Sequence, residues 1–470
     1  IVVLARNEAE VATLLRLAHH HQVALTLRAA GTSLSGQAVS DSVLVLVNEG
    51  WTQQDVLDEG ARIRLQPGVI GQHANDTLRP YGRKIGPDPA SIATARIGGM
   101  AANNSSGMCC GTRQNSYHTL HALRVMLADG TVLDTGDAAS VAAFRVSHAE
   151  LLTELSWLAT QARENTALHA KIRHKYRLKN TTGYGLNALI DFDDPVDILT
   201  HLMIGSEGTL GFVVEATVKL ARQPNNLTVL VLGAPGFREV MSILHAFQSK
   251  IDLTAFEFFS DKAMAHVLAH GVPRPFEGEA PFYCLLEFEG SSDGVMNDAM
   301  ALFEDCVEKG WVLDGVMSQS LAQASQLWQL RERISESISV YTPYKNDISV
   351  TVAKVPDFVE EVDAIVQANY PDFEIVWFGH IGDGNMHLNI LKPADLPKEE
   401  FFARCNNVSK WVFEIVEKYN GSISAEHGVG RTKKAYLGYS RSAEEIALMK
   451  AVKLAFDPNG IMNPGKIFDL

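Results

Sequence analysis

Two stretches near the C-terminal end of the chain contain residues that could hold a metal ion. In VWFGHIGDGNMHLNI, residues 376–390, His380 and His387 flank a Gly-Asp-Gly-Asn turn. In SAEHGVG, residues 424–430, Glu426 precedes a further histidine. A metal ion held by two His and one Glu keeps coordination positions open for a substrate. The combination therefore indicates an enzyme.

The residues around the two histidines predict a β-hairpin. Asp-Gly is the preferred pair of a two-residue type I′ loop, so Asp383 and Gly384 are expected to form the turn. In that register His380 lies directly opposite His387, with their Cβ atoms about 5 Å apart. Asn389 follows two residues after His387 and shares its face of the strand. The alternative is a hairpin with two surface histidines and no metal.

The Glu-His pair in the second stretch divides into two roles. Gly428 and Gly430 favour a tight loop over a helix. Since neighbouring residues cannot usually both bind one ion, Glu426 is expected to be the ligand and His427 a base beside it. The alternative is an ordinary charged loop.

The composition limits the classes of protein to which the chain can belong. Its 470 residues suggest two or three domains, and 46% hydrophobic with 20% charged residues is typical of a globular protein. A net charge of −14 without a basic stripe argues against nucleic-acid binding. No apolar run approaches the ~18 residues that span a bilayer. Because the chain begins with Ile, we expect that an N-terminal segment has been lost, and a targeting signal within it would be invisible.

The cysteines have no metal-binding spacing. They are Cys109, Cys110, Cys284, Cys306 and Cys405, and no two form a C-x-x-C pair. The sequence therefore lacks an iron–sulfur or structural zinc signature. An odd number of irregularly spaced cysteines fits a reducing compartment, in which we expect them to be packing residues.

A glycine-rich loop near the N-terminus could bind an anion. A helical pattern over 8–21 precedes a short strand at 23–27, the loop RAAGTSLSG at 28–36 and a second strand at 43–47. The backbone N–H groups of such a loop can face a phosphate. The loop has neither the P-loop nor the Rossmann signature, and a plain polar turn is the alternative.

The segment IGPDPASIATARIGGMAANNSSG, residues 85–107, is rich in small residues and almost free of charge. Small residues allow the backbone to approach a flat ligand closely. A hairpin at 122–134 and a helical pattern over 149–175 follow, and the stretch 205–221 ends as a strand. RQPNN, residues 222–226, marks the expected domain boundary.

Beyond the boundary the pattern indicates an α+β domain. In the helical stretch SQLWQLRERISESI, Arg331 and Ser335 are four residues apart and are expected to share a face. Strands are expected at 227–233, 283–290 and 345–352, and helices at 236–249, 295–309 and 443–456.

Five motifs resemble those of the FAD-linked oxidoreductases of the vanillyl-alcohol-oxidase type. They are RAAGTSLSG, PDPASIATARIGGMAANNSSG, GSEGTLG, GHIGDGNMHLNI with AEHGVG, and FDPNGIMNPGKI, and they span nearly the whole chain. The resemblance is closest to the branch that contains D-lactate dehydrogenases, glycolate oxidase flavin subunits and D-2-hydroxyglutarate dehydrogenases.

The resemblance implies a fold class and a division of the chain. The fold is α+β, with a two-subdomain FAD-binding domain, an antiparallel-sheet cap domain with helices on one face, and a C-terminal segment that returns to the flavin. The FAD-binding domain would cover 1–223, the substrate or cap domain with the metal site 224–432, and the C-terminal segment 433–470.

The resemblance also implies roles for single residues. A divalent metal, with Zn²⁺ as the first choice, would be held by His380, His387 and Glu426, and His427 would be the catalytic base. The substrate carboxylate would contact Arg331, Ser335, Lys345 and Asn389. Non-covalent FAD would contact Gly31, Thr32, Ser33, Gly36, Pro87, Asp88, Ser91, Gly98, Gly99, Asn103, Ser106, Gly107, Glu207, Gly208, Thr209 and Asn463.

The implied activity is the oxidation of a D-2-hydroxy acid to the 2-oxo acid by hydride transfer to FAD. D-lactate is the favoured substrate and D-2-hydroxyglutarate the alternative. A zinc-dependent hydrolase is a distant alternative, because it leaves the glycine-rich N-terminal half without a role. The electron acceptor would be a quinone, an electron-transfer flavoprotein or an iron–sulfur domain or subunit. We expect a homodimer. The expected location is the cytoplasm, with peripheral association to the inner membrane.

Overall fold

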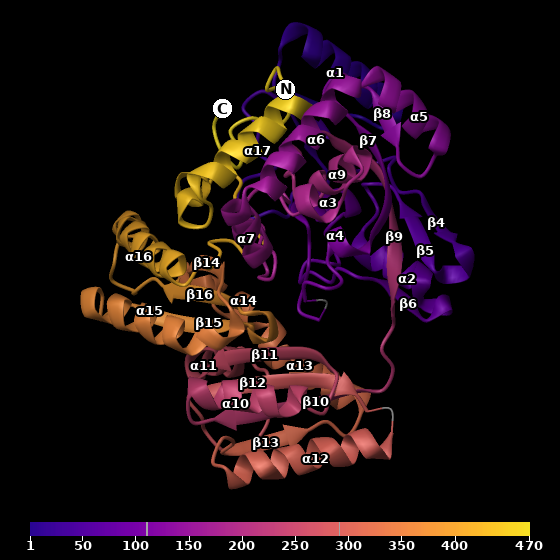
Figure 1. The fold of residues 1–470 in the computed structure, drawn as a ribbon. Coiled ribbons are helices and arrows are strands. Elements are labelled where there is room, and N and C mark those ends of the chain that lie inside the picture. The colour runs from indigo at the N-terminus through magenta and orange to yellow at the C-terminus, as the bar shows by residue number, and fades with distance from the viewer. Residues whose placement is uncertain (110, 291) are drawn as a thin grey trace. The chain divides into compact units, whose positions relative to one another are not determined.

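The computed structural model describes residues 1–109, 111–290 and 292–470, which form two compact units (Figure 1). Unit 1 consists of Ile1–Gln223 together with Ser424–Leu470, and unit 2 of Pro224–Ile423. The return to unit 1 thus begins at Ser424 rather than at residue 433, so the loop with Glu426 and His427 belongs to unit 1. Among the described residues, no helix is long and apolar enough to cross a membrane. Cys110, expected to be a packing residue, lies outside the described residues.

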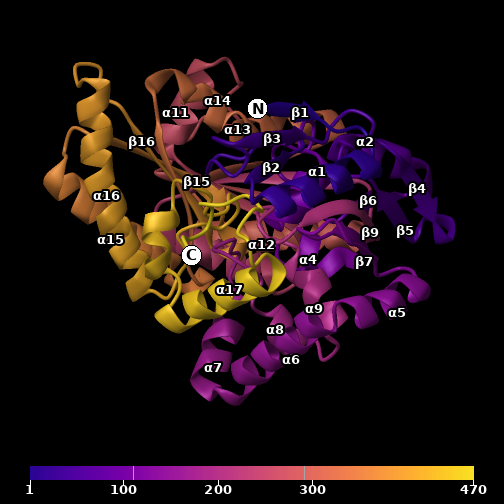
Figure 2. The ribbon, with the colours of Figure 1, turned by 90° about the horizontal axis from the view of Figure 1, so that it is seen from above.

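Unit 1 begins with a three-stranded parallel sheet in the order β1-β3-β2 (β1 Val2–Leu4, β2 Leu25–Arg28, β3 Val43–Leu46). Helix α1, Glu8–His21, starts where the side chain of Asn7 accepts a hydrogen bond from the Glu10 N–H. Its buried residues, including Val11 and Leu15, share one hydrophobic cluster with Leu25 and Val45 of the sheet. The helix lies beside β2 and β3 (Figure 2). The glycine-rich loop therefore leaves the C-terminal end of β2.

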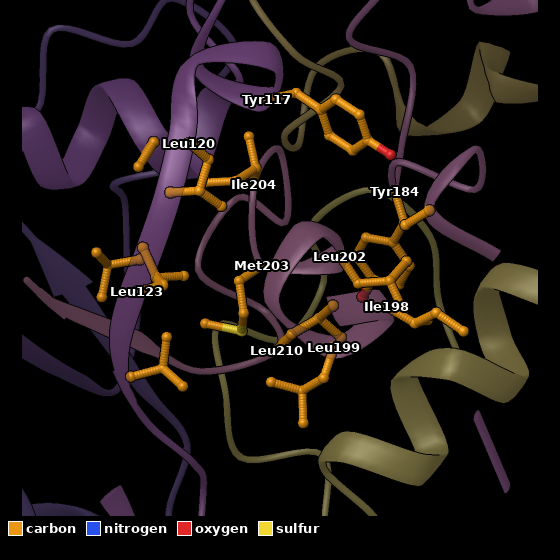
Figure 3. Packing of buried hydrophobic residues seen from close by; sticks show 14 of the residues in the cluster. Tyr117, Leu120, Leu123, Tyr184, Ile198, Leu199, Leu202, Met203, Ile204 and Leu210 are labelled. Atoms are coloured by element: carbon orange, nitrogen blue, oxygen red, sulfur yellow. The ribbon is translucent and has the colours of Figure 1, made fainter. Parts of the chain in front are cut away.

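The second sheet of unit 1 is antiparallel, in the order β4-β5-β9-β7-β8, with β6 also paired to β9. Leu120 and Leu123 of β7 pack with Leu199 and Leu202 of α9 in its core (Figure 3). The strands are β4 Gln54–Leu57, β5 Arg62–Leu65, β6 Arg83–Ile85, β7 Leu120–Met126, β8 Val132–Asp134 and β9 Phe212–Arg222.

Helices of unit 1 pack around this second sheet and carry the connections between its strands. The helical pattern expected over 149–175 is divided at Asn165, whose side chain caps the second helix by accepting from the Leu168 N–H. The helices are α2 Gly71–Leu78, α3 Ile97–Asn103, α4 Ser116–Thr119, α5 Ala138–Ser147, α6 Ala149–Glu164, α7 Thr166–Lys175, α8 Ala188–Asp191, α9 Pro195–Leu202 and α17 Ala443–Phe456, with short 3₁₀ turns η1 Asp58–Gly60, η2 Arg79–Tyr81 and η6 Lys434–Tyr439.

The C-terminal segment rejoins the N-terminal sheet. Helix α17 packs against α6 (Figure 2). After it, Met462 forms a parallel bridge with Leu25, and the N–H of Asn463 donates to the Leu25 carbonyl at 2.8 Å. The C-terminal segment thus contacts the N-terminal sheet at β2.

Unit 2 is built on a seven-stranded antiparallel sheet in the order β13-β10-β12-β11-β15-β16-β14. The strands are β10 Leu227–Ala234, β11 Leu253–Ser260, β12 Phe282–Glu289, β13 Asp314–Met317, β14 Tyr344–Ser349, β15 Glu374–His380 and β16 Asn385–Leu391. The helices are α10 Phe237–Gln248, α11 Asp261–Ala269, α12 Asp293–Glu308, α13 Leu321–Glu332, α14 Ile334–Ser337, α15 Val355–Asn369 and α16 Lys398–Lys418, with 3₁₀ turns η3 Ser339–Tyr341, η4 Val352–Lys354 and η5 Ile381–Asp383.

Helices cover both faces of this sheet, which corrects the expectation of helices on one face. Phe258 of β11 packs edge-on against Phe237 of α10, with ring centroids 5.0 Å apart. Its neighbour Phe259 points to the opposite face and shares a hydrophobic cluster with Leu327 of α13 and Ile334 of α14. Consecutive aromatic residues in one strand require burial on both faces.

The histidine hairpin has a longer loop than the sequence predicted. The type I′ register is wrong, because His380 pairs with Asn385 and His387 pairs with Phe378. Residues 381–383 form the turn η5, which Gly384 ends with a φ of 77°. The slip is two residues, and side chains alternate with a period of two, so both histidines still lie on one face. Asn389 also lies on that face, opposite Val376.

Candidate functional site

The glycine-rich loop of unit 1 holds the loop that carries Glu426 and His427. Gly31 and Gly36 have φ of 75° and 78°, a conformation that side chains disfavour. Between them, the carbonyl of Ser35 accepts from the Arg431 N–H at 2.8 Å, and the Ser35 hydroxyl donates to the Gly428 carbonyl at 3.1 Å. The predicted phosphate loop and the predicted base therefore share one backbone network.

Glu207 connects a second predicted FAD segment to the same loop. Its carboxylate accepts from the N–H groups of Val429 at 2.7 Å and Gly430 at 2.8 Å. Burial raises the pKa of Glu207 to about 7, against these hydrogen bonds, which lower it. A Cβ at Gly428 would lie 2.5 Å from the Glu207 carboxylate, so only glycine fits there. The side chain of Glu207 thus positions the loop.

Asn463 joins three segments that are distant in sequence. Its Nδ2 donates to the carbonyls of Gln37 at 3.1 Å and Glu207 at 2.7 Å. Its Oδ1 accepts from Thr26 at 2.8 Å and from Lys466 at 3.1 Å. This buried amide fixes the C-terminal segment against the predicted FAD residues.

Helix α3 and the loops around it supply the remaining predicted FAD positions. Asn103, at the end of α3, donates through Nδ2 to the Glu426 carbonyl at 2.6 Å. A Cβ at Gly107 would lie 2.1 Å from the Asp88 carbonyl, so these two segments touch through backbone. At Gly99, by contrast, a Cβ would meet no described atom within 4 Å, which leaves open space where a flat ligand could approach.

The other predicted FAD residues differ in exposure. The hydroxyl of Thr209 is buried and bonds the Ser206 carbonyl and the Tyr184 phenol. The hydroxyl of Ser33 bonds Gln37. Thr32, Ser33, Ser91 and Gly99 are exposed, Pro87 and Ser106 are buried, and Gly98 and Gly208 lie between these extremes.

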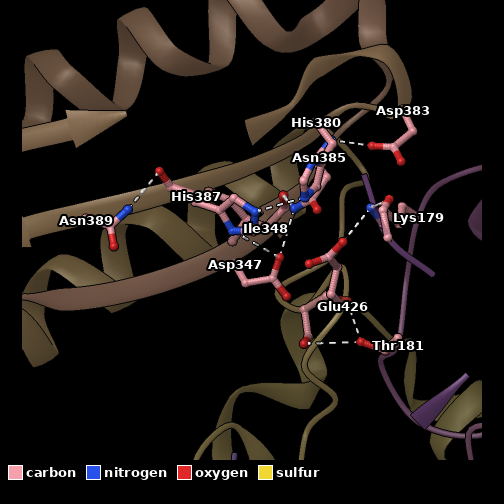
Figure 4. Close-up of polar contacts among 12 residues, drawn as sticks. Lys179, Thr181, Asp347, Ile348, His380, Asp383, Asn385, His387, Asn389 and Glu426 are labelled. Atoms are coloured by element: carbon pink, nitrogen blue, oxygen red, sulfur yellow. Dashed lines mark hydrogen bonds and ion pairs between the residues drawn. The ribbon is translucent and has the colours of Figure 1, made fainter. Parts of the chain in front are cut away.

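The loop with Glu426 and His427 is also held by residues 179–185, whose sequence is KNTTGYG. Lys179 is buried, and its ammonium pairs with the Glu426 carboxylate at 2.5 Å and donates to the Gly107 carbonyl at 3.0 Å (Figure 4). The hydroxyl of Thr181 accepts from the Gly428 N–H at 3.0 Å. The Glu426 carboxylate therefore lies directly beside a cationic side chain.

In unit 2, the imidazoles of His380 and His387 point toward each other across the hairpin (Figure 4). Their Nε2 atoms are 3.4 Å apart, and the rings are nearly perpendicular at 89°. Two nitrogens bound at 2.0–2.1 Å to one tetrahedral ion would themselves be about 3.4 Å apart. The pair thus has the spacing of two ligands to a shared ion.

Carboxylates lie against the opposite nitrogens of these rings. Glu257, fully buried on β11, has its two oxygens 2.7 and 2.8 Å from Nδ1 of His380. Asp347, paired with His387 across β14 and β16, has Oδ1 3.8 Å from Nδ1 of that ring. With the hydrogen of His380 on Nδ1, its Nε2 directs a lone pair into the space between the two rings. The donor set and the spacing of the two Nε2 atoms therefore fit a divalent metal.

Three of the predicted substrate residues surround this pair. Arg331 stacks over Phe378 at 4.7 Å, and its Nε lies 2.8 Å from Glu257. Within the described part of the chain, its two terminal nitrogens have no acceptor. Lys345 pairs with Asn389 across β14 and β16, which places both on the histidine face. Partial burial lowers the pKa of Lys345.

Ser335 does not share a helix with Arg331, contrary to the expectation. Helix α13 ends at Glu332, and Arg333, with φ −85° and ψ 1°, separates it from α14. Ser335 is exposed on that short helix. Residues four apart share a face only within an unbroken helix, so the spacing of Arg331 and Ser335 does not place their side chains together.

The sequence analysis missed Glu257, Asp347, Lys179 and Gln37. Glu257 had a usable signal, because a lone carboxylate inside the apolar strand LTAFEFFS must be paired when it is buried. Gln37, whose Nε2 donates to the His427 carbonyl at 2.7 Å, had none.

Comparisons with known proteins agree with the sequence motifs. Residues 1–136 match the FAD binding domain, and residues 223–467 match the C-terminal domain of FAD linked oxidases. The chain is 49% identical to a D-2-hydroxyglutarate dehydrogenase of Stutzerimonas stutzeri, over 99% of this chain and 90% of the relative. It is 39% identical to a D-2-hydroxyglutarate dehydrogenase of Xanthomonas citri pv. viticola, over 100% of this chain and 89% of the relative.

The fold also occurs among solved structures of low sequence identity. p-Cresol methylhydroxylase superposes with a TM-score of 0.66 at 12% identity, covering 100% of this chain and 88% of the other. Alkyldihydroxyacetonephosphate synthase gives 0.62 at 16% identity, covering 98% and 75%. The family match confirms FAD as the cofactor class and leaves the hydrolase alternative without support. The chain belongs to the FAD-linked oxidases and is an FAD-dependent oxidoreductase of the D-2-hydroxyglutarate and D-lactate dehydrogenase family.

Proposed function

We propose that this protein oxidises D-2-hydroxyglutarate to the 2-oxo acid with the help of a divalent metal. This reverses the order of the two substrates expected from the sequence. Both relatives named above are D-2-hydroxyglutarate dehydrogenases, whereas the D-lactate name occurs on a putative enzyme of Schizosaccharomyces pombe at 31% identity. The metal would be held by His380, His387 and Glu426, as the motifs imply.

The observation that carries the substrate proposal is the set of groups on the histidine face of unit 2. A five-carbon diacid has two carboxylates and needs two cationic contacts, whereas lactate needs one. The Arg331 guanidinium beside Glu257 and the Lys345 ammonium opposite Asn389 are two separate cations of this unit. Lys345 is exposed and has no carboxylate partner among the described residues. A second substrate carboxylate would satisfy it.

The chemistry divides among the residues as follows. When bound, the flavin accepts the hydride from C2 and the divalent ion acidifies the C2 hydroxyl. Arg331 offers two parallel N–H groups to the C1 carboxylate, which a lysine could not. His427 takes the hydroxyl proton on a ring nitrogen. Lys345 and Asn389 hold the distal carboxylate and set the length of the accepted acid. The product leaves as the 2-oxo acid, with one hydride and one proton removed.

The proposal is tested by anaerobic stopped-flow measurement of flavin bleaching by D-2-hydroxyglutarate, L-2-hydroxyglutarate and D-lactate. Lys345→Gln should raise the KM for D-2-hydroxyglutarate about 10- to 100-fold, the range of a charge-assisted hydrogen bond, with little change for D-lactate. Lys354→Gln, an exposed lysine of η4, is the matched control and should change neither.

If D-lactate bleaches the flavin of the unmodified enzyme faster than D-2-hydroxyglutarate does, D-lactate is the preferred substrate. Bleaching by the L-acid alone would refute the stereochemistry. Loss of bleaching on chelation, restored by added Zn²⁺ or Mn²⁺, is expected if the metal is required. The electron acceptor and the oligomeric state stay predictions.

A further inference from the structure

Amide side chains hold the peptide groups on either side of His427, the proposed base. The Glu426 carbonyl accepts from Asn103 Nδ2 at 2.6 Å, and the His427 carbonyl accepts from Gln37 Nε2 at 2.7 Å. Because a peptide group is planar, a bond to its carbonyl restrains the whole group. The two amides together therefore restrict φ and ψ of His427, and with them the direction in which its side chain leaves the backbone.

Gln37 is 8% exposed, and its amide has partners at both ends. Its Oε1 accepts from the Ser33 hydroxyl, and its Nε2 donates to the His427 carbonyl and to the Glu207 carboxylate. A backbone carbonyl can only accept, so the NH₂ group must face His427 and the oxygen must face Ser33. The backbone carbonyl of Gln37 is held as well, by Asn463 Nδ2 at 3.1 Å. The amide thus has one orientation and one position.

This amide reaches His427 from the segment that the sequence assigned to the FAD phosphates. Ser33 and Gly36 are predicted FAD contacts, and Gln37 follows Gly36 directly. Ser33 is exposed, whereas Gln37 is buried. A ligand that orders the glycine-rich loop at Ser33 therefore also orders the group that holds the His427 carbonyl.

We propose that Gln37 is a positioning residue that makes the placement of His427 depend on bound FAD. The cofactor orders the glycine-rich loop, the loop fixes the Gln37 amide, and the amide fixes the backbone from which the imidazole projects. The inference rests on the proposed role of His427 as the base. The alternative is a clamp that holds residues 425–430 equally well with and without FAD.

Hydrogen–deuterium exchange of residues 425–430 in the FAD-loaded and the FAD-free chain separates these two cases. In the unmodified protein, FAD should slow exchange of this segment about fivefold or more, and in Gln37→Leu by less than twofold. Gln37→Glu should behave like Gln37→Leu, because it keeps the shape and an acceptor for Ser33 but has no N–H group for His427. Gln161→Leu, at an exposed position of α6, should match the unmodified protein.

Anaerobic flavin reduction tests the consequence for the base, with whichever of the hydroxy acids above bleaches the flavin. A displacement of about 1 Å can cost on the order of 100-fold in rate, so Gln37→Leu should lower the limiting rate about 10- to 100-fold. The KM should stay within threefold, because Gln37 is not among the proposed substrate contacts. The exchange measurement uses no substrate, so it stands whichever acid the enzyme oxidises.

Three results would overturn the proposal. An equal effect of FAD on exchange in the unmodified protein and in both Gln37 variants would show that the amide does not couple the two loops. A raised KM with an unchanged limiting rate would assign Gln37 to substrate binding. Loss of FAD from both variants, seen in their absorption spectra, would make Gln37 part of the cofactor site itself.

Discussion

A buried carboxylate decides which nitrogen of His380 faces the paired imidazole. Glu257 is fully buried and contacts both His380 Nδ1 and Arg331 Nε. An isolated buried carboxylate would be strongly unfavourable, and these two partners compensate it. Because the same anion orients a predicted metal ligand and a predicted substrate ligand, its charge matters to both.

Glu257→Gln is expected to weaken metal binding about 10- to 100-fold, the usual effect of removing the partner of a metal-bound histidine. The glutamine keeps the volume but loses the charge that fixes the Nδ1 hydrogen of His380. Chelator competition with Zn²⁺ measures the affinity, and the FAD spectrum reports folding. Glu287→Gln removes another buried acid of the same sheet, one bonded to Trp328 and Thr254, and should leave the affinity within twofold. Equal affinities in the two variants would show that Glu257 is only structural.

At the scale of the element, the sequence predicted which side chains share a face of a strand better than it predicted which residues pair across the hairpin. Asp-Gly indicated a two-residue turn at 383–384, whereas the chain forms a four-residue loop, because Gly384 packs against the backbone of Val350. That contact is long-range and leaves no local signal. His380, His387 and Asn389 still share one face of the hairpin, because the pairing is shifted by two residues, an even number. The Arg331–Ser335 argument failed because a single non-helical residue interrupts the helix.

The hairpin should therefore be sensitive to the glycine that closes its loop. A Cβ at Gly384, with φ 77°, would lie 2.0 Å from the Val350 carbonyl oxygen. Gly271 has a similar φ of 84° but no atom within 4 Å of its Cβ position, so Gly271→Ala has the backbone strain alone. Gly384→Ala should unfold at a lower temperature than Gly271→Ala, by about 2–4 °C for each kcal/mol of clash. Identical melting temperatures would show that the loop accommodates the methyl group.

The 424–430 loop depends on one carboxylate and should respond to pH. The pKa of Glu207 is about 7 in the folded protein, above the ordinary value of 4.5, because of burial. Ionisation of Glu207 therefore reduces folding stability as pH rises from about 4.5 to about 7, by on the order of 3 kcal/mol. Glu207→Gln lacks this ionisation but loses an acceptor at every pH.

The expected result is a melting-temperature deficit of Glu207→Gln that is largest near pH 5 and shrinks toward pH 8. Differential scanning fluorimetry across that range measures it. The exposed Glu164→Gln supplies the control, with no trend relative to the unmodified protein. A deficit that grows with pH would mean that the ionised carboxylate is the stabilising form, held by the Val429 and Gly430 N–H groups.

At the scale of the whole molecule, the chain leaves unit 1 and returns to it. The sequence indicated this path through motifs at both ends, because the family that these motifs resemble places both of them at one flavin. It could not indicate that the return begins at Ser424, since that depends on Glu207, Ser35 and Thr181, whose contacts with the loop are more than 200 residues apart in sequence. The glycines of a sequence indicate where another segment packs closely against the backbone, but they do not indicate which segment that is.

Because Asn463 ties the C-terminal segment to Thr26, Gln37 and Glu207, FAD retention should depend on the last residues of the chain. A chain that ends at Met462 should purify with little flavin, whereas deletion of Leu470 alone, which is 59% exposed, should leave FAD stoichiometric. Asn463→Ala keeps the whole backbone and separates the amide's role from a general loss of folding. It should bind FAD more weakly while its circular dichroism stays unchanged. Full flavin content in both the truncated chain and Asn463→Ala would show that the segment closes the fold without supporting the cofactor. The Asn463 amide is the group to test, because it alone bonds β2, Gln37 and Glu207 together among the contacts named above.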